Sequence, residues 1–303
     1  MGQKKCNNLL VMRRFNNESS IYIIEWITTQ LLSIAPREII SFEVLNQEYS
    51  ARGFKYWVDL ANILKSKMLM PKDIDDKYIL IRFQKLNLEN SFHNSKDTTE
   101  KYGVDSKFFE IDKSNEASFI YYYLQALKNV DISNKKRIIN LGINRGDEFE
   151  IIQELIPQNS IEFVGIDYSK SAINYAKNRF QSNKFRFFQD DINSLDYNKL
   201  GKFDLLITIG TLQSVNSNFK LLFMELFKNL LSKEASLILG FPNSRWIDGE
   251  LIYGAKAPNY PYSELSILFN DISFCKKYLQ QHKYRVTITG KDYIFLTATR
   301  IGL

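Results

Sequence analysis

The residues that could bind a nucleotide-like ligand begin in residues 137–152, RIINLGINRGDEFEII. Gly142 and Gly146 let the backbone turn tightly and approach a ligand, and the next helix would start with unpaired N–H groups suited to an anion. Asp167 follows Gly146 by twenty-one positions, at the predicted end of a second strand. Its carboxylate is suited to accept hydrogen bonds from both hydroxyls of a ribose.

A third acidic position has the same relation to a strand. Residues 184–190 read as a strand, and Asp191 and Ile192 follow it, so a carboxylate there can accept a hydrogen bond from an adenine amino group. The three strand ends would meet at the switch-point crevice where such sheets bind nucleotides. Taken singly, each glycine is explained by an ordinary turn and each Asp by helix capping. Only their joint placement favours a nucleotide site.

An NAD-dependent enzyme is the competing nucleotide-binding interpretation. Its fingerprint needs glycines at positions 142, 144 and 147. Asn144 and Asp147 occupy the last two positions, which makes this interpretation much weaker.

Residues 116–300 resemble the class I S-adenosylmethionine-dependent methyltransferase family, whose usual pattern is an acid and three glycines after strand one, an acid after strand two, and Asp or Gly-Asp after strand three. The resemblance implies S-adenosylmethionine as cofactor, with the glycines at its methionine part, Asp167 at its ribose, and Asp191 with Ile192 at its adenine. The cofactor-binding positions it implies are Asn140, Gly142, Asn144, Gly146, Asp167, Tyr168, Asp190, Asp191, Ile192, Gly210 and Thr211.

Two positions depart from the family pattern. Asn140 stands where the family usually has Asp or Glu, and Asn144 stands at the middle glycine. Asn accepts hydrogen bonds and tolerates unusual backbone angles better than most residues, so cofactor binding is compatible with both changes. A cofactor-binding protein without catalysis stays open as an alternative.

The acceptor side of the sheet is predicted after the fourth and fifth strands. Residues 207–215, ITIGTLQSV, lack the Asn-Pro-Pro-Tyr motif of the family members that methylate exocyclic amines of nucleobases. Residues 240–264 form a polar and aromatic stretch that we interpret as the acceptor loop, although its aromatic side chains could equally cover the sheet end. The tentative substrate-binding residues are Gln213, Asn243, Arg245, Trp246, Tyr253, Lys256 and Tyr260. No catalytic base can be assigned.

Short apolar runs alternate with amphipathic stretches from residue 136 onward, which predicts an α/β fold with a doubly wound, mostly parallel, seven-stranded sheet. The predicted strands are residues 136–142, 161–167, 184–190, 203–210, 235–242, 284–290 and 293–300, and the last two form a terminal antiparallel hairpin. The predicted helices are residues 117–129, 147–156, 170–180, 218–231 and about 262–282.

The front of the chain is expected to be a small α/β segment, with helical periodicity in residues 21–34 and 54–69 and a strand at 78–86. Its element order is compatible with a winged-helix-like unit. The predicted domains are an accessory segment (1–90), a linker or lid (91–115) that includes Tyr102 and Phe109, and a cofactor-binding methyltransferase domain (116–303).

Composition bounds the remaining choices. The net charge of +6 would help a polyanion approach, but residues 1–116 hold 17 Lys and Arg against 16 Asp and Glu, so the front segment is not a basic arm. Two cysteines at an uninformative spacing indicate a reducing compartment, and the absence of long apolar runs argues against a membrane, so we expect a cytoplasmic protein. His93 and His282 lie in no metal-binding pattern, and no metal is expected.

The sequence therefore predicts a methyltransferase that acts on a small-molecule acceptor, with a homodimer left open. The alternative from another substrate class is an RNA methyltransferase that uses the front segment to hold the polyanion.

Overall fold

The computed structural model describes residues 13–90, 100–157, 160–213, 218–255 and 264–302. The chain divides into two compact units. The N-terminal unit comprises Met1–Ser91 together with Trp246–Tyr253, and the C-terminal unit comprises Phe92–Arg245 and Gly254–Leu303. No helix in the described part of the chain is both long and apolar enough to cross a membrane.

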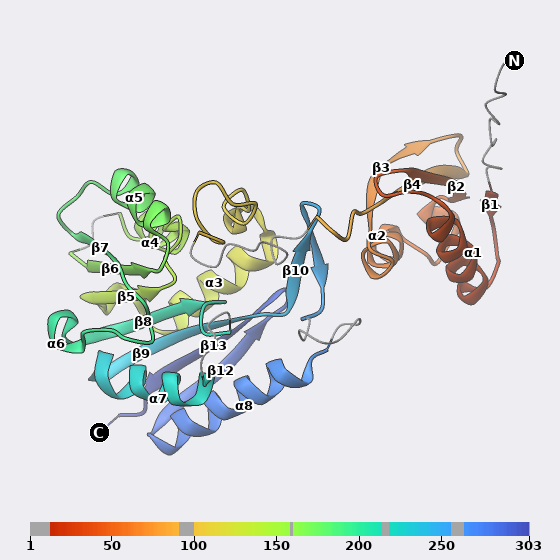
Figure 1. Cartoon of the computed structure of the whole chain (residues 1–303). Helices are drawn as coiled ribbons and strands as arrows, with labels where there is room; N and C mark the ends of the chain where they lie inside the picture. The colour runs from red at the N-terminus through yellow and green to blue at the C-terminus, as the bar shows by residue number, and fades with distance from the viewer. Residues whose placement is uncertain (1–12, 91–99, 158–159, 214–217, 256–263, 303) are drawn as a thin grey trace, which may run out of the picture. The chain divides into compact units, whose positions relative to one another are not determined.

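The C-terminal unit is built on a seven-stranded sheet in the order β12-β13-β9-β8-β5-β6-β7 (Figure 1). Its strands are β5 (Arg137–Leu141), β6 (Glu162–Asp167), β7 (Phe185–Gln189), β8 (Phe203–Ile209), β9 (Leu231–Pro242), β12 (Tyr284–Gly290) and β13 (Tyr293–Arg300). The strands from β5 to β9 are parallel, whereas β13 runs antiparallel to both β9 and β12. This confirms the predicted fold class and its terminal hairpin.

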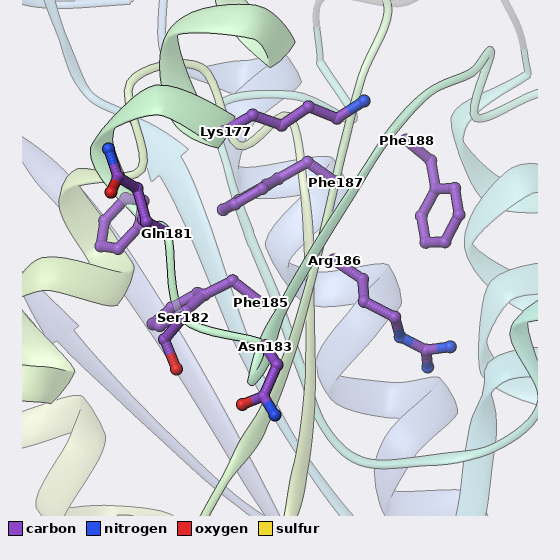
Figure 2. A pocket seen from close by; sticks show the side chains of 9 residues that line it. Lys177, Gln181, Ser182, Asn183, Phe185, Arg186, Phe187 and Phe188 are labelled. Atoms are coloured by element: carbon purple, nitrogen blue, oxygen red, sulfur yellow. The ribbon is translucent and has the colours of Figure 1, made fainter.

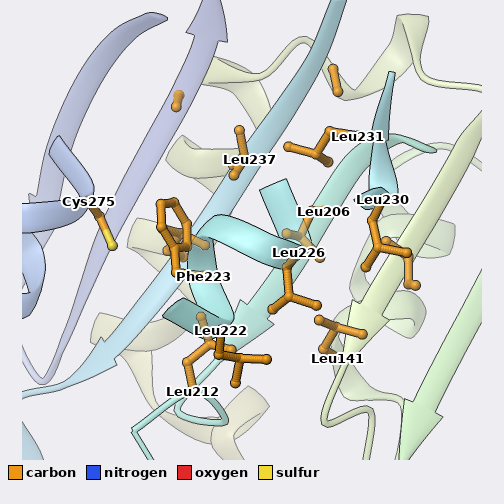
Figure 3. Packing of buried hydrophobic residues seen from close by; sticks show 14 of the residues in the cluster. Leu141, Leu206, Leu212, Leu222, Phe223, Leu226, Leu230, Leu231, Leu237 and Cys275 are labelled. Carbon is orange, nitrogen blue, oxygen red and sulfur yellow. The ribbon is translucent and has the colours of Figure 1, made fainter. Parts of the chain in front are cut away.

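Helices cover both faces of this sheet because its strands are apolar on both sides. Ile138 packs in one buried cluster and Ile139 in the other, as alternating side chains of a strand must. The first face is covered by α3 (Ala117–Asn129), α4 (Asp147–Leu155) and α5 (Lys170–Arg179). The second face is covered by α6 (Tyr197–Leu200), α7 (Phe219–Leu230) and α8 (Ser266–Gln281), and Figure 3 shows Phe223 and Leu226 of α7 within its cluster.

The strand order creates one switch point, at β5. Chain order runs outward from β5 through β6 to β7 on one side and from β8 to β9 on the other. The connections after β5 and β8 therefore leave toward opposite faces of the sheet, and sheets of this kind bind ligands outside the carboxyl ends of the strands at such a switch point. The loops after β5, β6 and β7 follow the strand ends from which a ligand would be bound.

The N-terminal unit packs two helices on a four-stranded sheet in the order β1-β2-β4-β3. Its elements are β1 (Arg13–Phe15), α1 (Ser20–Ser33), β2 (Ile39–Leu45), the 3-10 turn η1 (Gln47–Tyr49), α2 (Phe54–Ile63), β3 (Ser66–Asp73) and β4 (Tyr78–Lys85). The order of helix, strand, helix and two-stranded ribbon is compatible with the winged-helix-like expectation. Strands β1 and β2, which pair in parallel, were not predicted.

The helix predicted over residues 54–69 is wrong in its second half. Helix α2 ends at Ile63, and residues from Ser66 onward form β3. Lys65 has a φ of 54°, the left-handed conformation that commonly stops a helix. The apolar residues Met68 and Leu69 continue the helical period by coincidence and belong to the strand pairing with β4.

A second difference concerns residues 244–253, which were expected to be an acceptor loop. They form a hairpin of β10 (Ser244–Ile247) and β11 (Glu250–Tyr253). Asp248 and Gly249 connect the strands with φ values of 51° and 81°, as a two-residue type I′ turn requires. Trp246–Tyr253 of this hairpin belong to the N-terminal unit.

Polar contacts fix the hairpin tip within the N-terminal unit. The Asp248 carboxylate accepts hydrogen bonds from the Asn87 backbone N–H at 3.0 Å and from Nδ2 of Asn90 at 2.6 Å, and it pairs with Arg37 at 3.2 Å. Asn62 of α2 donates to the Leu251 carbonyl and accepts from the Tyr253 N–H. Ile247 and Ile252 of the hairpin pack with Leu86.

Candidate functional site

Asp167, at the carboxyl end of β6, is the best-defined polar group at the switch point. Its residue is 8% exposed, and its carboxylate accepts backbone N–H groups from Asn144 (2.9 Å) and Ser169 (3.0 Å). Burial raises the pKa of the Asp167 carboxyl group, and the hydrogen bonds from Ser169 and Asn144 offset that effect only in part. A carboxylate held this way keeps lone pairs that can accept hydrogen bonds from the hydroxyl groups of a ligand.

The glycines after β5 are required by packing. Gly142 has a φ of 79°, and a side chain there would overlap the Thr211 side chain, whose hydroxyl donates to the Leu141 carbonyl at 3.0 Å. Gly146 has a φ of 84°, and a Cβ there would overlap the ring of Phe180. Both glycines therefore keep the turn close to neighbouring elements, which is the plain structural interpretation of these two positions.

Asn144 adopts the left-handed conformation at the tip of this turn, with a φ of 45°. Asn is among the few residues with a side chain that adopt this conformation readily. Its side-chain Nδ2 donates to the Tyr102 carbonyl at 2.7 Å, while its backbone N–H serves Asp167. The backbone at this tip thus accommodates Asn144, and its side chain makes a contact with Tyr102.

A buried charge pair lies next to Asn140. Glu148, in the first turn of α4, pairs with Lys113 at 2.7 Å, and the exposed fractions of the two side chains are 3% and 12%. Burial alone would lower the pKa of Lys113, but the Glu148 carboxylate raises it overall. Nδ2 of Asn140 lies 3.4 Å from the other oxygen of Glu148. Glu148 thus brings a negative charge next to Asn140.

The strand end after β7 carries two carboxylates that are occupied locally. Asp190 accepts the N–H of Asp191 at 2.9 Å, and Asp191 accepts both the N–H and the side chain of Asn193. Ile192 is 6% exposed and Tyr168 is 52% exposed. The side chains of Asp190 and Asp191 are half-buried and shape this turn, as helix or turn caps commonly do.

Residues 100–116, which we call the cover segment, reach the turns after both β5 and β6. The Glu100 carboxylate accepts hydrogen bonds from the Ser169 hydroxyl at 2.8 Å, from the Ser171 hydroxyl, and from the Lys170 N–H at 3.1 Å. At the other turn, Arg145 donates to the Phe109 carbonyl at 3.3 Å. Together with the Asn144 contact to Tyr102, these bonds hold the predicted lid residues beside the candidate site.

The acceptor-side residues divide among several environments. Gly210 has a φ of 76° and packs near Pro242, and Gln213 is exposed. Asn243 is 7% exposed and donates from Nδ2 to the Lys291 carbonyl at 2.8 Å, so it has a structural role at the end of β9. Trp246 and Tyr253 lie in the part of the hairpin that belongs to the N-terminal unit, and Lys256 and Tyr260 lie outside the described residues. Arg245 is half-buried in the C-terminal unit.

Figure 2 shows a hollow at the outer edge of the sheet, next to the end of α5 and strand β7. It is lined by residues that include Lys177, Phe185 and Phe187. Gln181, Ser182 and Asn183 of its lining precede β7, so the hollow lies toward the amino end of that strand. It does not coincide with the strand ends that carry Asp167, and we assign it no part in the chemistry. No cluster of metal-ligating side chains occurs among the described residues.

Sequence reasoning missed three charged residues at this site: Glu100, Lys113 and Glu148. Glu148 could have been noticed because an acid in the first turn of a helix faces the strand ends. Glu100 and Lys113 come from a segment without periodicity, and only tertiary contacts bring them to the turns after β5 and β6.

Comparison with known proteins gives one family match. A family model described as "Methyltransferase domain" matches residues 132–285, which is half of the chain. Among curated proteins, none matches the sequence significantly.

Solved structures give further similarities. The plantazolicin methyltransferase BpumL in complex with SAH is 15% identical, with 67% of this chain and 94% of that chain covered and a TM-score of 0.49. A SAM-dependent methyltransferase from Aquifex aeolicus is 15% identical (63% and 100% covered, TM-score 0.43), and the methyltransferase domain of bacterial CtHen1 is 19% identical (60% and 97%, TM-score 0.43). Because these identities are below 25% and the TM-scores are below 0.5, the assignment of the chain to the methyltransferase domain family rests on the family model.

Proposed function

Because the chain belongs to the methyltransferase domain family, we propose that it transfers a methyl group to a nucleophile on a small-molecule acceptor. S-adenosylmethionine is the cofactor, and when bound it supplies a sulfonium methyl group as the electrophile. In this proposal residues 116–303 form the methyltransferase domain, residues 91–115 a linker and lid, and residues 1–90 an accessory segment.

The observation that carries the proposal is the buried Asp167 carboxylate at the switch point. It is fixed by two backbone N–H groups, one from the turn after β5 and one from the turn after β6. A carboxylate held there is suited to accept hydrogen bonds from the two hydroxyls of the cofactor ribose. Asp191 and Ile192 would hold the adenine, and Gly142 with Gly146 would border the methionine part.

The departure at Asn140 is offset by its neighbour in this proposal. The Glu148 carboxylate lies within 3.4 Å of Asn140 Nδ2, so a negative charge stands near the usual acidic position. Asn140 and Glu148 would together orient the cofactor ammonium, which supports an active protein over a silent one. Because Lys113 already pairs with Glu148, the cofactor would share this carboxylate with the cover segment.

The residues of the chain act mainly by positioning. Methyl transfer requires the acceptor in line with the sulfonium methyl, and exclusion of water helps to keep the reactants in that arrangement. The cover segment, with Tyr102 and Phe109, would close the cofactor side, and Gly210, Thr211 and Gln213 would border the acceptor. Tyr168 and Asp190 would lie along the ribose and adenine edge.

The charge and surface of the N-terminal unit favour a small acceptor over RNA. Phe54, Val58 and Ile63 of α2 are exposed, so this helix offers an apolar surface where an RNA-binding helix would offer cations. A polyanion-binding unit would also need an excess of Lys and Arg that residues 1–116 lack. The two alternatives that the experiment must distinguish from this proposal are an RNA methyltransferase and a protein that binds the cofactor without catalysis.

The test begins with calorimetric titration of the purified chain with S-adenosylmethionine and with S-adenosylhomocysteine. Transfer of a labelled methyl group is then compared between a small-molecule extract and cellular RNA. Saturable binding with label in the small-molecule fraction supports the proposal. Label in RNA, with transfer that falls steeply as salt rises, would mean that the acceptor is RNA and not a small molecule. Binding without any transfer indicates the silent protein, and absence of binding by the folded chain refutes the proposal.

A further inference from the structure

Arg245 is held firmly at the end of the fifth parallel strand. The two residues before it are anchored: the Asn243 N–H donates to the Asp292 carbonyl at 2.8 Å, and the Ser244 hydroxyl donates to Oδ1 of Asp292, also at 2.8 Å. Oδ2 of Asp292 in turn accepts the Ser118 hydroxyl at 2.6 Å. The backbone that carries Arg245 is therefore fixed by a buried polar network.

The guanidinium of Arg245 has poor compensation for its charge. Its closest acceptor is the Gly254 carbonyl, 3.5 Å from Nη1, and no carboxylate of the described residues lies within ion-pair distance. Burial lowers its pKa, with no opposing contribution from an acid. A guanidinium has five N–H donors, so most of its donor capacity is unused.

Other half-buried arginines of the C-terminal unit are compensated. Arg137 pairs with Glu162 at 2.8 Å, Arg179 pairs with Asp147 at 2.7 Å, and Arg145 lies 3.7 Å from that same carboxylate. Arg300 covers the ring of Tyr284 and donates to the His282 carbonyl. Arg285 is exposed to solvent, so its charge needs no partner.

A half-buried cation without a counter-charge has lost part of its hydration, and an anionic ligand would compensate for that loss. Carboxylates and phosphates match the guanidinium fork and form two parallel hydrogen bonds with it. The desolvation that Arg245 has already undergone would then strengthen its attraction to such an anion.

The position of Arg245 separates it from the cofactor turns. Strand β8 lies between β5 and β9 in the sheet, and Arg245 follows the carboxyl end of β9. The turns that carry Asn140, Gly142 and Asp167 belong to β5 and β6. Arg245 is therefore on the side of the sheet edge where the acceptor is expected.

We propose that Arg245 is a specificity-determining residue that binds an anionic group, a carboxylate or a phosphate, on the methyl acceptor. The inference rests on the proposed function, because it takes the edge beyond β8 and β9 as the acceptor side. It narrows the acceptor to small molecules that carry a negative charge beside the nucleophile.

The experiment follows the side-chain Nε–Hε resonances of ¹⁵N-labelled protein, with and without S-adenosylhomocysteine. The Arg245 signal is identified by its loss in Arg245→Lys. The probes are benzoate and phenyl phosphate, with benzamide as the neutral counterpart of benzoate. We expect the Arg245 signal to shift saturably with at least one anion and not with benzamide. The stronger of the two anions identifies the chemistry as carboxylate or phosphate.

Two variants complete the design. Arg245→Gln should weaken binding of the preferred anion at least ten-fold, whereas Arg285→Gln, at an exposed arginine of β12, should leave it unchanged. The proposal is overturned if neither anion moves the Arg245 signal, if benzamide moves it equally, or if Arg245→Gln binds the anion normally.

Cofactor binding separates this inference from the proposed function. Arg245→Gln should bind S-adenosylhomocysteine as wild type does. Loss of that binding in the variant alone would instead assign Arg245 to the cofactor, which contradicts the inference. Failure of wild type itself to bind S-adenosylhomocysteine would refute the proposed function, while the anion titration without it would still report on Arg245.

Discussion

The backbone N–H of Asn144 donates a 2.9 Å hydrogen bond to Oδ2 of Asp167. This bond joins the turn after β5 to the end of β6, so the turns after these two strands share one buried carboxylate. The Asn144 side chain extends the connection to Tyr102 of the cover segment. Because Asp167 is the carboxylate that both turns share, we expect its substitution to weaken cofactor binding.

Asp167→Asn should weaken binding of S-adenosylmethionine by about 10- to 100-fold, because a hydrogen bond to a charged group contributes about 1.5–3 kcal/mol. The amide keeps the shape of the carboxylate but loses its charge and one acceptor. Calorimetric titration measures the effect. Glu154→Gln, an exposed carboxylate of α4, is the matched control and should bind normally. Equal affinity of Asp167→Asn and wild type would remove Asp167 from the cofactor site.

Cofactor affinity should also depend on pH through Asp167. Its pKa is raised above the ordinary 3.8, mainly by burial. Acidification from neutral pH therefore protonates Asp167 before an ordinary carboxyl group, and affinity should fall with a midpoint above 3.8. The effect of Asp167 on folding stability has the opposite sign. Because the pKa of Asp167 is higher in the folded chain than in the unfolded chain, the free energy of unfolding falls as pH rises through the raised pKa. A titration series in Asp167→Asn should lack this step in affinity, and its persistence would point to another group.

The buried pair of Lys113 and Glu148 should show strong coupling. Lys113→Met or Glu148→Gln alone should lower the free energy of unfolding by about 3–5 kcal/mol, because each leaves one buried polar or charged group without its partner. The double variant should lose less than the two singles combined. Chemical denaturation of all four proteins gives the coupling. Additive losses would mean that the two side chains do not stabilise one another.

The pH dependence of this pair has a defined sign. The pKa of Lys113 is raised above the ordinary 10.5, with Glu148 overcoming the opposite effect of burial. The stabilisation is therefore complete below 10.5 and is lost as pH rises through the raised value. Wild type and the double variant should differ by a constant amount across neutral pH.

Gly142→Ala tests the packing interpretation of the turn. The new methyl group would overlap Thr211 at a φ of 79°, so we expect a loss of about 1–3 kcal/mol from backbone strain, with a further loss from the clash. Gly249→Ala is the control, since its φ is 81° and no atom lies within 4 Å of a Cβ placed there. Adding Thr211→Ala to Gly142→Ala should recover part of the stability lost to the clash, because it removes the hydroxyl and methyl groups of Thr211 but keeps its Cβ, 2.8 Å from the new methyl group. Equal losses in the two glycine variants would argue against the contact with Thr211.

The central sheet was predictable because β5, β6 and β8 are continuous apolar runs that can only be covered on both faces. The positions of Gly142, Gly146 and Asp167, just after two of these apolar runs, predicted turns at the carboxyl ends of β5 and β6. The assignment of individual site residues is still a prediction. Glu100 and Lys113 could not have been placed, because their contacts depend on the path of a segment with no periodic pattern.

The hairpin of β10 and β11 was predictable in principle. Asp248-Gly249 between SRWI and ELIY is a strong short-range signal for a two-residue turn. The aromatic and polar composition of residues 240–264 is typical of a loop and obscures this turn signal. The early end of α2 is different in kind, because nothing in residues 54–69 marks Lys65 as left-handed before the pairing of β3 with β4 is known.

Asp248→Asn should separate the hairpin's turn from its attachment within the N-terminal unit. Asn is as well suited as Asp to the left-handed φ of 51°, so the turn itself should persist. The substitution removes the negative charge that pairs with Arg37 and accepts hydrogen bonds from Asn87 and Asn90. The free energy of unfolding of this unit should therefore fall by about 1.5–3 kcal/mol at neutral pH. Asp76→Asn, at an exposed carboxylate beyond β3, is the matched control.

The acid response of Asp248 completes that test. Burial raises the pKa of its carboxyl group, but the bonds from Asn90, Asn87 and Arg37 outweigh burial and lower it below the ordinary 3.8. Its stabilisation is therefore present above 3.8 and is lost as pH falls through the lowered value. Wild type and Asp248→Asn should converge in stability on acidification, whereas Asp76→Asn should match wild type at neutral pH. A difference between wild type and Asp248→Asn that persists below both pKa values would mean that the shape of the turn, and not the carboxylate charge, holds the hairpin.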